Sequence, residues 1–114
     1  MRKRFAAHYV FYGQALYMYY IEIQDGLFAG VFPLDEELAG TAFFDGILLP
    51  LPVSMEREAV DAVLSYLRRE HLPLTWENFS SGFPGNNLIG ENDPVRLFLL
   101  DSHRYSSSEL STNN

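Results

Sequence analysis

The 114-residue chain contains no cysteine and only one lysine, Lys3. Without thiols it can have no disulfide framework, no thiolate zinc site and no cysteine nucleophile. The absence of cysteine also fits a reducing compartment, and we expect a cytoplasmic protein. No stretch approaches the roughly 18 apolar residues of a membrane helix. His8 and the tyrosines after the basic start interrupt any signal-peptide core, so we expect no membrane partner.

Positive charge is scarce along the chain, with 8 Lys and Arg against 15 Asp and Glu and a net charge of −7. A nucleic-acid partner is therefore disfavoured, because phosphate contacts need a basic surface. Apolar residues make up 47% of the sequence and aromatic residues 15%, which is enough for a packed core. Length and composition together predict a single folded domain.

The motifs of common catalytic and cofactor sites are also missing. His8, His71 and His103 lie far apart and show no metal-ligand spacing, which favours structural roles. The glycines between residues 82 and 90 do not form a phosphate loop, and no serine stands in a G-x-S-x-G elbow. From the residues alone we expect no catalytic residue, no bound metal and no cofactor.

Alternating and β-branched or aromatic segments predict a mainly β fold. The predicted strands cover residues 4–13, 14–23, 27–34, 41–53, 74–79 and 95–101. The turn at Asp25-Gly26 favours a tight hairpin, because glycine accepts positive φ at little cost. The first three strands should therefore form a meander, and Asp45-Gly46 predicts a bulge or tight turn in the fourth.

One amphipathic helix is predicted over residues 54–71, with Ser54 as its N-cap and Pro73 beyond its end. Its apolar side chains recur at helical spacing on one face. We expect a small β-sandwich or partly open barrel of about six or seven strands with this helix packed on it. The domain should span residues 1–105, and the polar segment 106–114 should be a disordered tail.

Tyrosines crowd the first two predicted strands. They are Tyr9, Tyr12, Tyr17, Tyr19 and Tyr20. Strict alternation would place Tyr17 and Tyr19 on one face with Ile21 and Ile23. Such residues serve either as core or as a contact for a partner, and aromatic enrichment favours contact with a second copy or another protein.

The segment 80–94 is a second candidate site, because it is a long Gly- and Pro-rich loop. Loops of this length without secondary structure are usually functional. It could act as a lid over a small ligand at one end of the β domain.

The run from His8 to Pro50 resembles the N-terminal segment of metal-dependent hydrolases of the amidohydrolase superfamily. The resemblance is carried by the Asp25-Gly26 turn and by the pattern Gly46-x-x-Leu49-Pro50. In the family, that strand leads to a His-x-His pair that binds metal, and those positions are Glu56 and Glu58 here. The segment 90–101 is similar to the strand with which the family's chain returns from its catalytic barrel.

The resemblance implies the β-sandwich, or composite, domain of those hydrolases without the catalytic barrel. The metal-binding histidines and lysine of the family are absent, so an enzyme is not expected. Glu56 and Glu58 stand two apart in a predicted helix, where side chains diverge, and are better explained as its acidic first turn. We expect a non-catalytic interaction or structural protein that forms a homo-oligomer or binds a hydrolase. The alternatives are a small-ligand module using loop 80–94 and a residual hydrolase with a carboxylate-bound metal.

Overall fold

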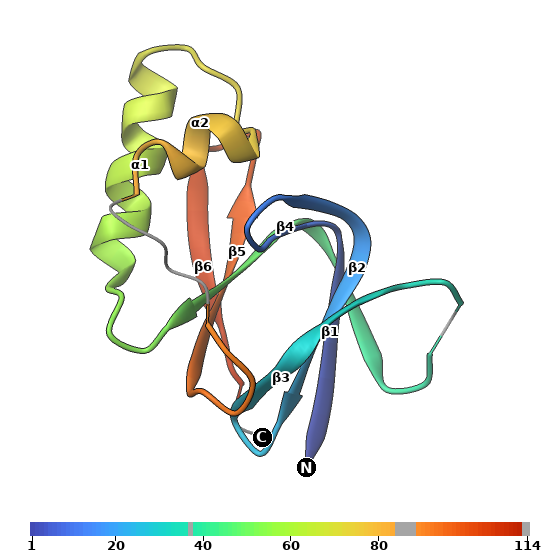
Figure 1. Ribbon diagram of the computed structural model, residues 1–114. Coiled ribbons are helices and arrows are strands. Elements are labelled where there is room, and N and C mark those ends of the chain that lie inside the picture. The colour runs from blue at the N-terminus through green and yellow to red at the C-terminus, as the bar shows by residue number, and fades with distance from the viewer. Residues whose placement is uncertain (37, 84–88, 113–114) are drawn as a thin grey trace.

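The computed structural model describes residues 1–36, 38–83 and 89–112, and in this part of the chain six strands form one mixed sheet (Figure 1). The strands are β1 (Arg2–Phe11), β2 (Ala15–Gln24), β3 (Leu27–Pro33), β4 (Thr41–Pro52), β5 (Val95–Asp101) and β6 (Ser106–Leu110). Their order across the sheet is β3-β2-β1-β4-β5-β6. The predicted mainly β class and the meander of β1, β2 and β3 are both confirmed.

The two halves of the sheet meet where β1 and β4 pair in parallel, while all other neighbouring strands are antiparallel. The sheet does not close into a barrel. It curls, however, because the start of β3 bonds to the segment before β5. The backbone N–H of Phe28 donates to the carbonyl of Asp93 at 2.9 Å, and Asn92 N–H donates to the Phe28 carbonyl at 2.7 Å. The result is the partly open form that the sequence predicted.

A line of irregular backbone crosses three strands at the level of His8 in β1. On one side of it, Met18 of β2 has a φ of 57°, and on the other, Gly46 of β4 has a φ of 145° at a shift in strand register. The bulge predicted at Asp45-Gly46 is therefore confirmed. The expectation that Tyr17 and Tyr19 share a face is wrong, because the unusual backbone at Met18 breaks the period-two alternation.

Two buried clusters lie on opposite faces of the sheet. One face packs against the helices and includes Phe11, Ile47 and Phe98. The other lies inside the curl of the sheet and includes Val10 and Ile21. Neighbouring residues alternate between the two clusters at the end of β1, in the second half of β4 and along β5, so these parts of the sheet are buried on both faces.

The helical layer consists of α1 (Arg57–Arg69) and α2 (Trp76–Ser80). In Figure 1, α1 runs beside β5 and β6 and lies far from β3. The apolar face of α1 is buried as the sequence predicted, but the helix begins later. Its N-cap is Glu56, in an extended backbone and without a side-chain cap, and not Ser54. Met55 N–H donates to the Pro52 carbonyl at 3.0 Å, so a turn occupies the predicted first residues.

The segment 74–79, predicted as a strand, contains the one-turn helix α2 instead. The Thr75 side chain caps it by accepting a bond from the Asn78 N–H at 3.1 Å. Phe79 is buried against Phe11, with ring centroids 5.8 Å apart. The prediction failed because a five-residue helix is too short to show helical periodicity, while its aromatic residues are typical of strands.

The prediction of a disordered tail over residues 106–114 is wrong for Ser106–Leu110, which form the edge strand β6. The serines gave no apolar alternation, but Ser107 is buried and bonded to α1. Its hydroxyl donates to Asp61 at 2.6 Å and accepts from Arg57 Nε at 3.2 Å. Polar contacts to the helix thus replace the apolar contacts that usually mark a strand. Residues 113 and 114 of the predicted tail lie outside the described part.

Candidate functional site

Five aromatic side chains gather on the face of the sheet that carries the helices, in the half that the helices leave uncovered. We call Tyr9, Tyr17, Tyr20, Phe32 and Phe43 the exposed aromatic face. The exposed fractions of four of them are 62% for Tyr17, 49% for Phe43, 42% for Tyr9 and 39% for Phe32. The ring centroids of Tyr9 and Tyr17 are 5.4 Å apart, and those of Tyr20 and Phe32 are 5.5 Å apart.

Strand pairing makes this face continuous. Ala6 pairs with Tyr20 on one side and with Phe43 on the other, and it is fully buried although no helix lies over it. Beyond the irregular line, Tyr9 pairs with Tyr17 and with Ile47, which belongs to the core under the helices. The exposed aromatic face therefore extends the apolar surface of the helical side into a region with no cover.

The remaining two of the predicted interface tyrosines pack on the opposite face. Tyr19 packs against the cluster inside the curl. Tyr12 packs on Phe28, with centroids 5.4 Å apart, and its hydroxyl donates to the Ile89 carbonyl at 2.6 Å. Burial, and then the nearby charge of Asp93, raise the pKa of Tyr12, as expected for a phenol used for packing. Tyr9, Tyr17 and Tyr20 are thus the three that lie on the exposed aromatic face.

The positions of the hydrolase-like pattern lie along β4 and the start of α1. Gly46 stands at the bulge and Pro50 is buried in β4. Glu56 is the N-cap of α1 and Glu58 lies in its first turn, as expected for helix-terminal acids. Among the described residues, no three His, Cys, Asp or Glu side chains form a group that could hold a metal ion.

Arg96 occupies the space between the start of α1 and the sheet edge. It makes two bonds to the Glu109 carboxylate, at 3.0 and 2.8 Å, and donates to the Met55 carbonyl at 2.7 Å. The bonds from Arg96 lower the pKa of Glu109. The hydrogen bonds to Glu109 raise the pKa of Arg96, and the nearby charges of Glu58 and Glu56 add a smaller effect in the same direction. Arg96 of β5 therefore joins the turn before α1 to β6.

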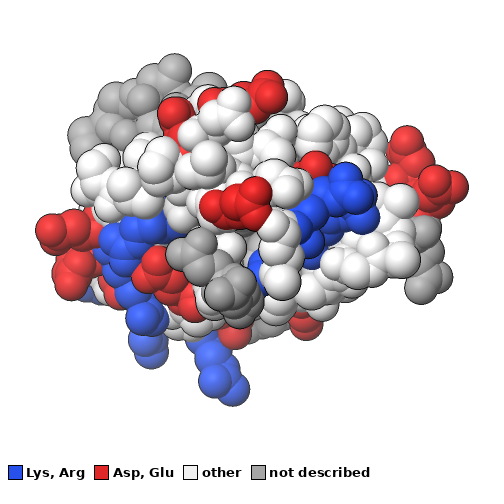
Figure 2. All heavy atoms as spheres, turned by 90° about the horizontal axis from the view of Figure 1, so that it is seen from below, with Lys and Arg blue, Asp and Glu red and all other residues white. Residues whose placement is uncertain are grey.

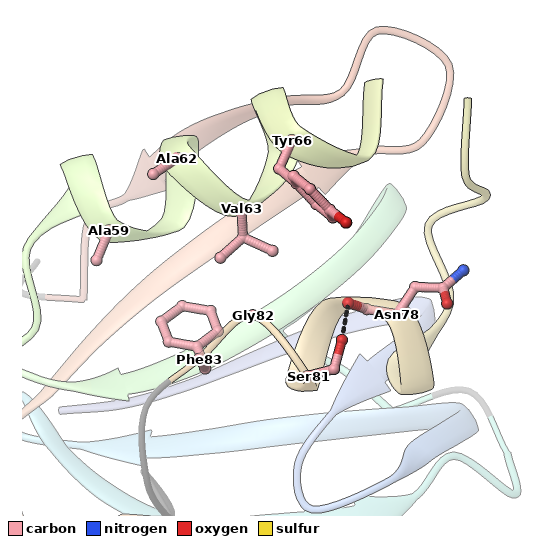
Figure 3. A pocket seen from close by; sticks show the side chains of 8 residues that line it. All are labelled: Ala59, Ala62, Val63, Tyr66, Asn78, Ser81, Gly82 and Phe83. Atoms are coloured by element: carbon pink, nitrogen blue, oxygen red, sulfur yellow. Dashed lines mark hydrogen bonds between the residues drawn. The ribbon is translucent and has the colours of Figure 1, made fainter. Parts of the chain in front are cut away.

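A groove of about 490 Å³ lies between α1 and the segment formed by α2 and the residues after it (Figure 3). Its lining residues are Ala59, Ala62, Val63, Tyr66, Asn78, Ser81, Gly82 and Phe83. Val63 and Tyr66 point from α1 toward the opposite wall. Gly82 approaches α1 so closely that a Cβ there would lie 3.0 Å from Val63 Cγ1. The two walls are thus in contact at the floor and open above it.

The described residues that line the groove are uncharged. Its floor is apolar, and the polar side chains among its lining residues are those of Tyr66, Asn78 and Ser81. The Asn78 amide donates to the Pro73 carbonyl at 2.8 Å, and the Ser81 hydroxyl donates to the Asn78 carbonyl at 2.9 Å. Among the residues that the structure describes, no acid, histidine, lysine or arginine lines it. Ser81, Gly82 and Phe83 begin the predicted ligand loop 80–94, of which residues 84–88 lie outside the described part. The described beginning of the loop therefore does border a concavity.

The charged side chains on the end of the molecule shown in Figure 2 are mixed in sign. Lysine and arginine there form separate groups with acidic neighbours, not one basic stripe. Arg4 and Glu22 form an ion pair at 3.2 Å, and their side chains are largely buried. Among the described residues, no helix has the length and apolar character needed to span a membrane.

Comparisons with protein-family models, with curated proteins and with solved structures gave no match to this chain. The site must therefore be understood from its own geometry. That geometry comprises an uncovered aromatic face, a groove between the helices whose described lining is uncharged, and the bonds of Arg96 that join the turn before α1 to β6.

Proposed function

We propose that this protein is a non-catalytic interaction protein that forms a homodimer through the exposed aromatic face. The observation that carries the proposal is the placement of four partly exposed rings, Tyr9, Tyr17, Phe32 and Phe43, on one continuous face. Aromatic side chains are enriched in protein interfaces because they bury a large area with few rotatable bonds.

The exposed area suits a contact between two small proteins. At roughly 200 Å² per ring, the exposed fractions of these four rings correspond to on the order of 400 Å². The largest apolar patch on a monomer is typically about 300–600 Å², and a standard interface buries about 800 Å² on each partner. The four rings would supply about half of the area that one partner buries in a standard interface. Tyr20, His8 and the neighbouring backbone extend this surface.

The charges near this face permit two copies to meet. Each chain carries a net charge of −7, so a dimer interface must avoid placing acids opposite acids. On this face Glu22 is already paired with Arg4, with side chains only 18% and 20% exposed. Pairing of Glu22 removes one charge that a second copy would otherwise bury, whereas Asp45, fully exposed and 3.9 Å from His8, has to stay in contact with water when the copies dock.

Replacing Tyr17 or Phe43 with glutamate should convert the dimer to a monomer. Each substitution places a charge in the middle of the contact, where its burial would be unfavourable. Size-exclusion chromatography with light scattering should give twice the chain mass of 13.0 kDa for the wild type and the single mass for each variant.

Tyr66→Glu is the matched control, because Tyr66 is 49% exposed but lies on α1, away from the aromatic face. This variant should remain dimeric. A wild-type protein that stays monomeric at every concentration tested, or a Tyr66→Glu variant that dissociates equally, would contradict the proposal.

Descent from the composite domain of amidohydrolase-type enzymes remains part of this proposal as a hypothesis. It is supported by the strand and turn pattern from Asp25 to Pro50 in the sequence. In full-length relatives of that kind the domain packs on a barrel, so an isolated copy needs another cover for apolar surface. If the wild type is monomeric alone but binds such a hydrolase, the same face would serve a different partner.

Ligand binding in the groove between α1 and α2 is a second candidate function, favoured by its apolar floor and polar rim. Phenol, a ring with one hydroxyl, should shift the methyl resonances of Val63 in an NMR titration. Ala62→Phe fills the groove and should abolish these shifts, whereas Ser65→Phe, on the exposed side of α1, should leave them unchanged. Shifts that persist in Ala62→Phe would place the phenol elsewhere.

A further inference from the structure

A second cavity, of about 310 Å³, lies on the other side of α2 from the groove. Its lining residues are Tyr9, Phe11, Ala15, Ile47, Leu74, Thr75, Trp76 and Glu77. Three of the eight are aromatic, and they come from two elements that are distant in sequence. Phe11 and Trp76 pack edge to face, with ring centroids 5.4 Å apart and planes at 71°. The packing fixes the indole of Trp76 against a buried ring.

Glu77 gives this cavity its charge. It is exposed and makes no ion pair in the part of the chain that the structure describes. No lysine, arginine or histidine is among the lining residues. The positive end of α2 lies nearby, but a single helical turn aligns few peptide dipoles and opposes a cation only weakly. The cavity therefore combines aromatic walls with one uncompensated negative charge.

Aromatic walls with a carboxylate at the rim suit one class of ligand, a small organic cation. The π-face of an aromatic ring attracts a cation within about 6 Å of its centroid, and tryptophan does so most strongly. A primary ammonium needs hydrogen-bond acceptors around its three N–H groups, and four of the lining side chains, those of Phe11, Ala15, Ile47 and Leu74, carry none. A methylated ammonium needs no such acceptors, because its charge is spread over methyl groups that pack on rings.

We infer that the cavity bounded by Tyr9, Phe11, Trp76 and Glu77 binds a small methylated ammonium compound, with the rings packing on its methyl groups and the Glu77 carboxylate balancing its charge. This site differs from the proposed dimer contact, because Trp76 and Glu77 line the cavity and are not part of the exposed aromatic face. Tyr9 belongs to both surfaces, so Trp76 and Glu77 are the residues that separate the two proposals.

Trp76 is the only tryptophan of the chain, and its fluorescence therefore reports on this cavity directly. Choline is the probe, and the matched probe is its uncharged isostere, in which carbon replaces the quaternary nitrogen. Choline should change Trp76 emission with saturation, and the isostere should bind about tenfold more weakly, because it lacks the cation–π and carboxylate terms. Glu77→Gln should weaken choline binding about fivefold and leave the isostere unaffected.

Glu70→Gln is the control variant, because it removes the same charge at an exposed position outside the cavity. Its affinity for choline should equal that of the wild type. The inference is overturned if emission does not saturate with choline, if the isostere binds as tightly as choline, or if Glu70→Gln weakens binding as much as Glu77→Gln. Circular dichroism of each variant verifies that the fold is retained.

Discussion

Leu64→Asp is expected to unfold the protein. Leu64 is fully buried at the centre of the α1 face that packs on the sheet, in one cluster with Leu67, Phe79 and Phe98. The substitution removes an apolar side chain, leaves a cavity and buries a carboxylate without a partner. The combined cost should exceed about 4 kcal/mol, which is most of the stability of a small domain. Far-ultraviolet circular dichroism should show loss of the native spectrum.

Ser65→Asp is the control for this change, because Ser65 is the next residue of the same helix and is exposed. An exposed substitution normally alters stability by no more than about 0.5 kcal/mol, and the variant should unfold in urea near the wild-type midpoint. A soluble Leu64→Asp protein with a native spectrum and cooperative unfolding would show that α1 does not pack as described.

Gly46→Ala is expected to have the second-largest effect, a loss of about 3 kcal/mol or more in the free energy of unfolding. Gly46 has a φ of 145°, a region of the backbone map that is essentially restricted to glycine. A Cβ there would also lie 2.7 Å from the carbonyl oxygen of Leu100. Relief of that overlap requires β4 to move away from β5 at the pair Ile47–Leu100. Urea denaturation measured by circular dichroism gives the change.

Gly40→Ala is the control for Gly46→Ala, because it places an alanine at a positive φ without a close contact. Gly40 also has a positive φ, of 76°, but a Cβ at this position meets no atom within 4 Å. We expect its substitution to cost about 1 kcal/mol from the backbone alone. Equal losses in the two variants would mean that the close approach of β4 and β5 contributes nothing.

The local features of the fold could be predicted from the sequence. The amphipathic face of α1, the tight turn at Asp25-Gly26 and the bulge at Gly46 depend on residues within one turn or one strand. Helical spacing selects the buried face of a helix whatever it packs against. Glycine likewise marks positive φ before any strand has found its partner. For these features the sequence and the structure agree.

The candidate sites depended on long-range pairing, which a local pattern does not contain. The faces of Tyr17 and Tyr19 separate because Met18 takes a positive φ inside a strand, and nothing in its side chain demands that. Phe11 and Trp76 line one cavity only because α2 folds back onto β1. The Glu77 carboxylate becomes relevant only through that contact.

The sequence by itself determined the mainly β class, the amphipathic helix, and the turn and bulge of the sheet at Gly26 and Gly46. Each of these follows from short-range periodicity or from backbone sterics. The tertiary structure alone decided that β1 lies parallel to β4, that the serine-rich segment forms β6, and that aromatic side chains are left exposed in the half of the sheet without helices. The reason is physical. Which strands become neighbours depends on burying apolar surface over the whole chain, and that burial also determines which surface remains exposed.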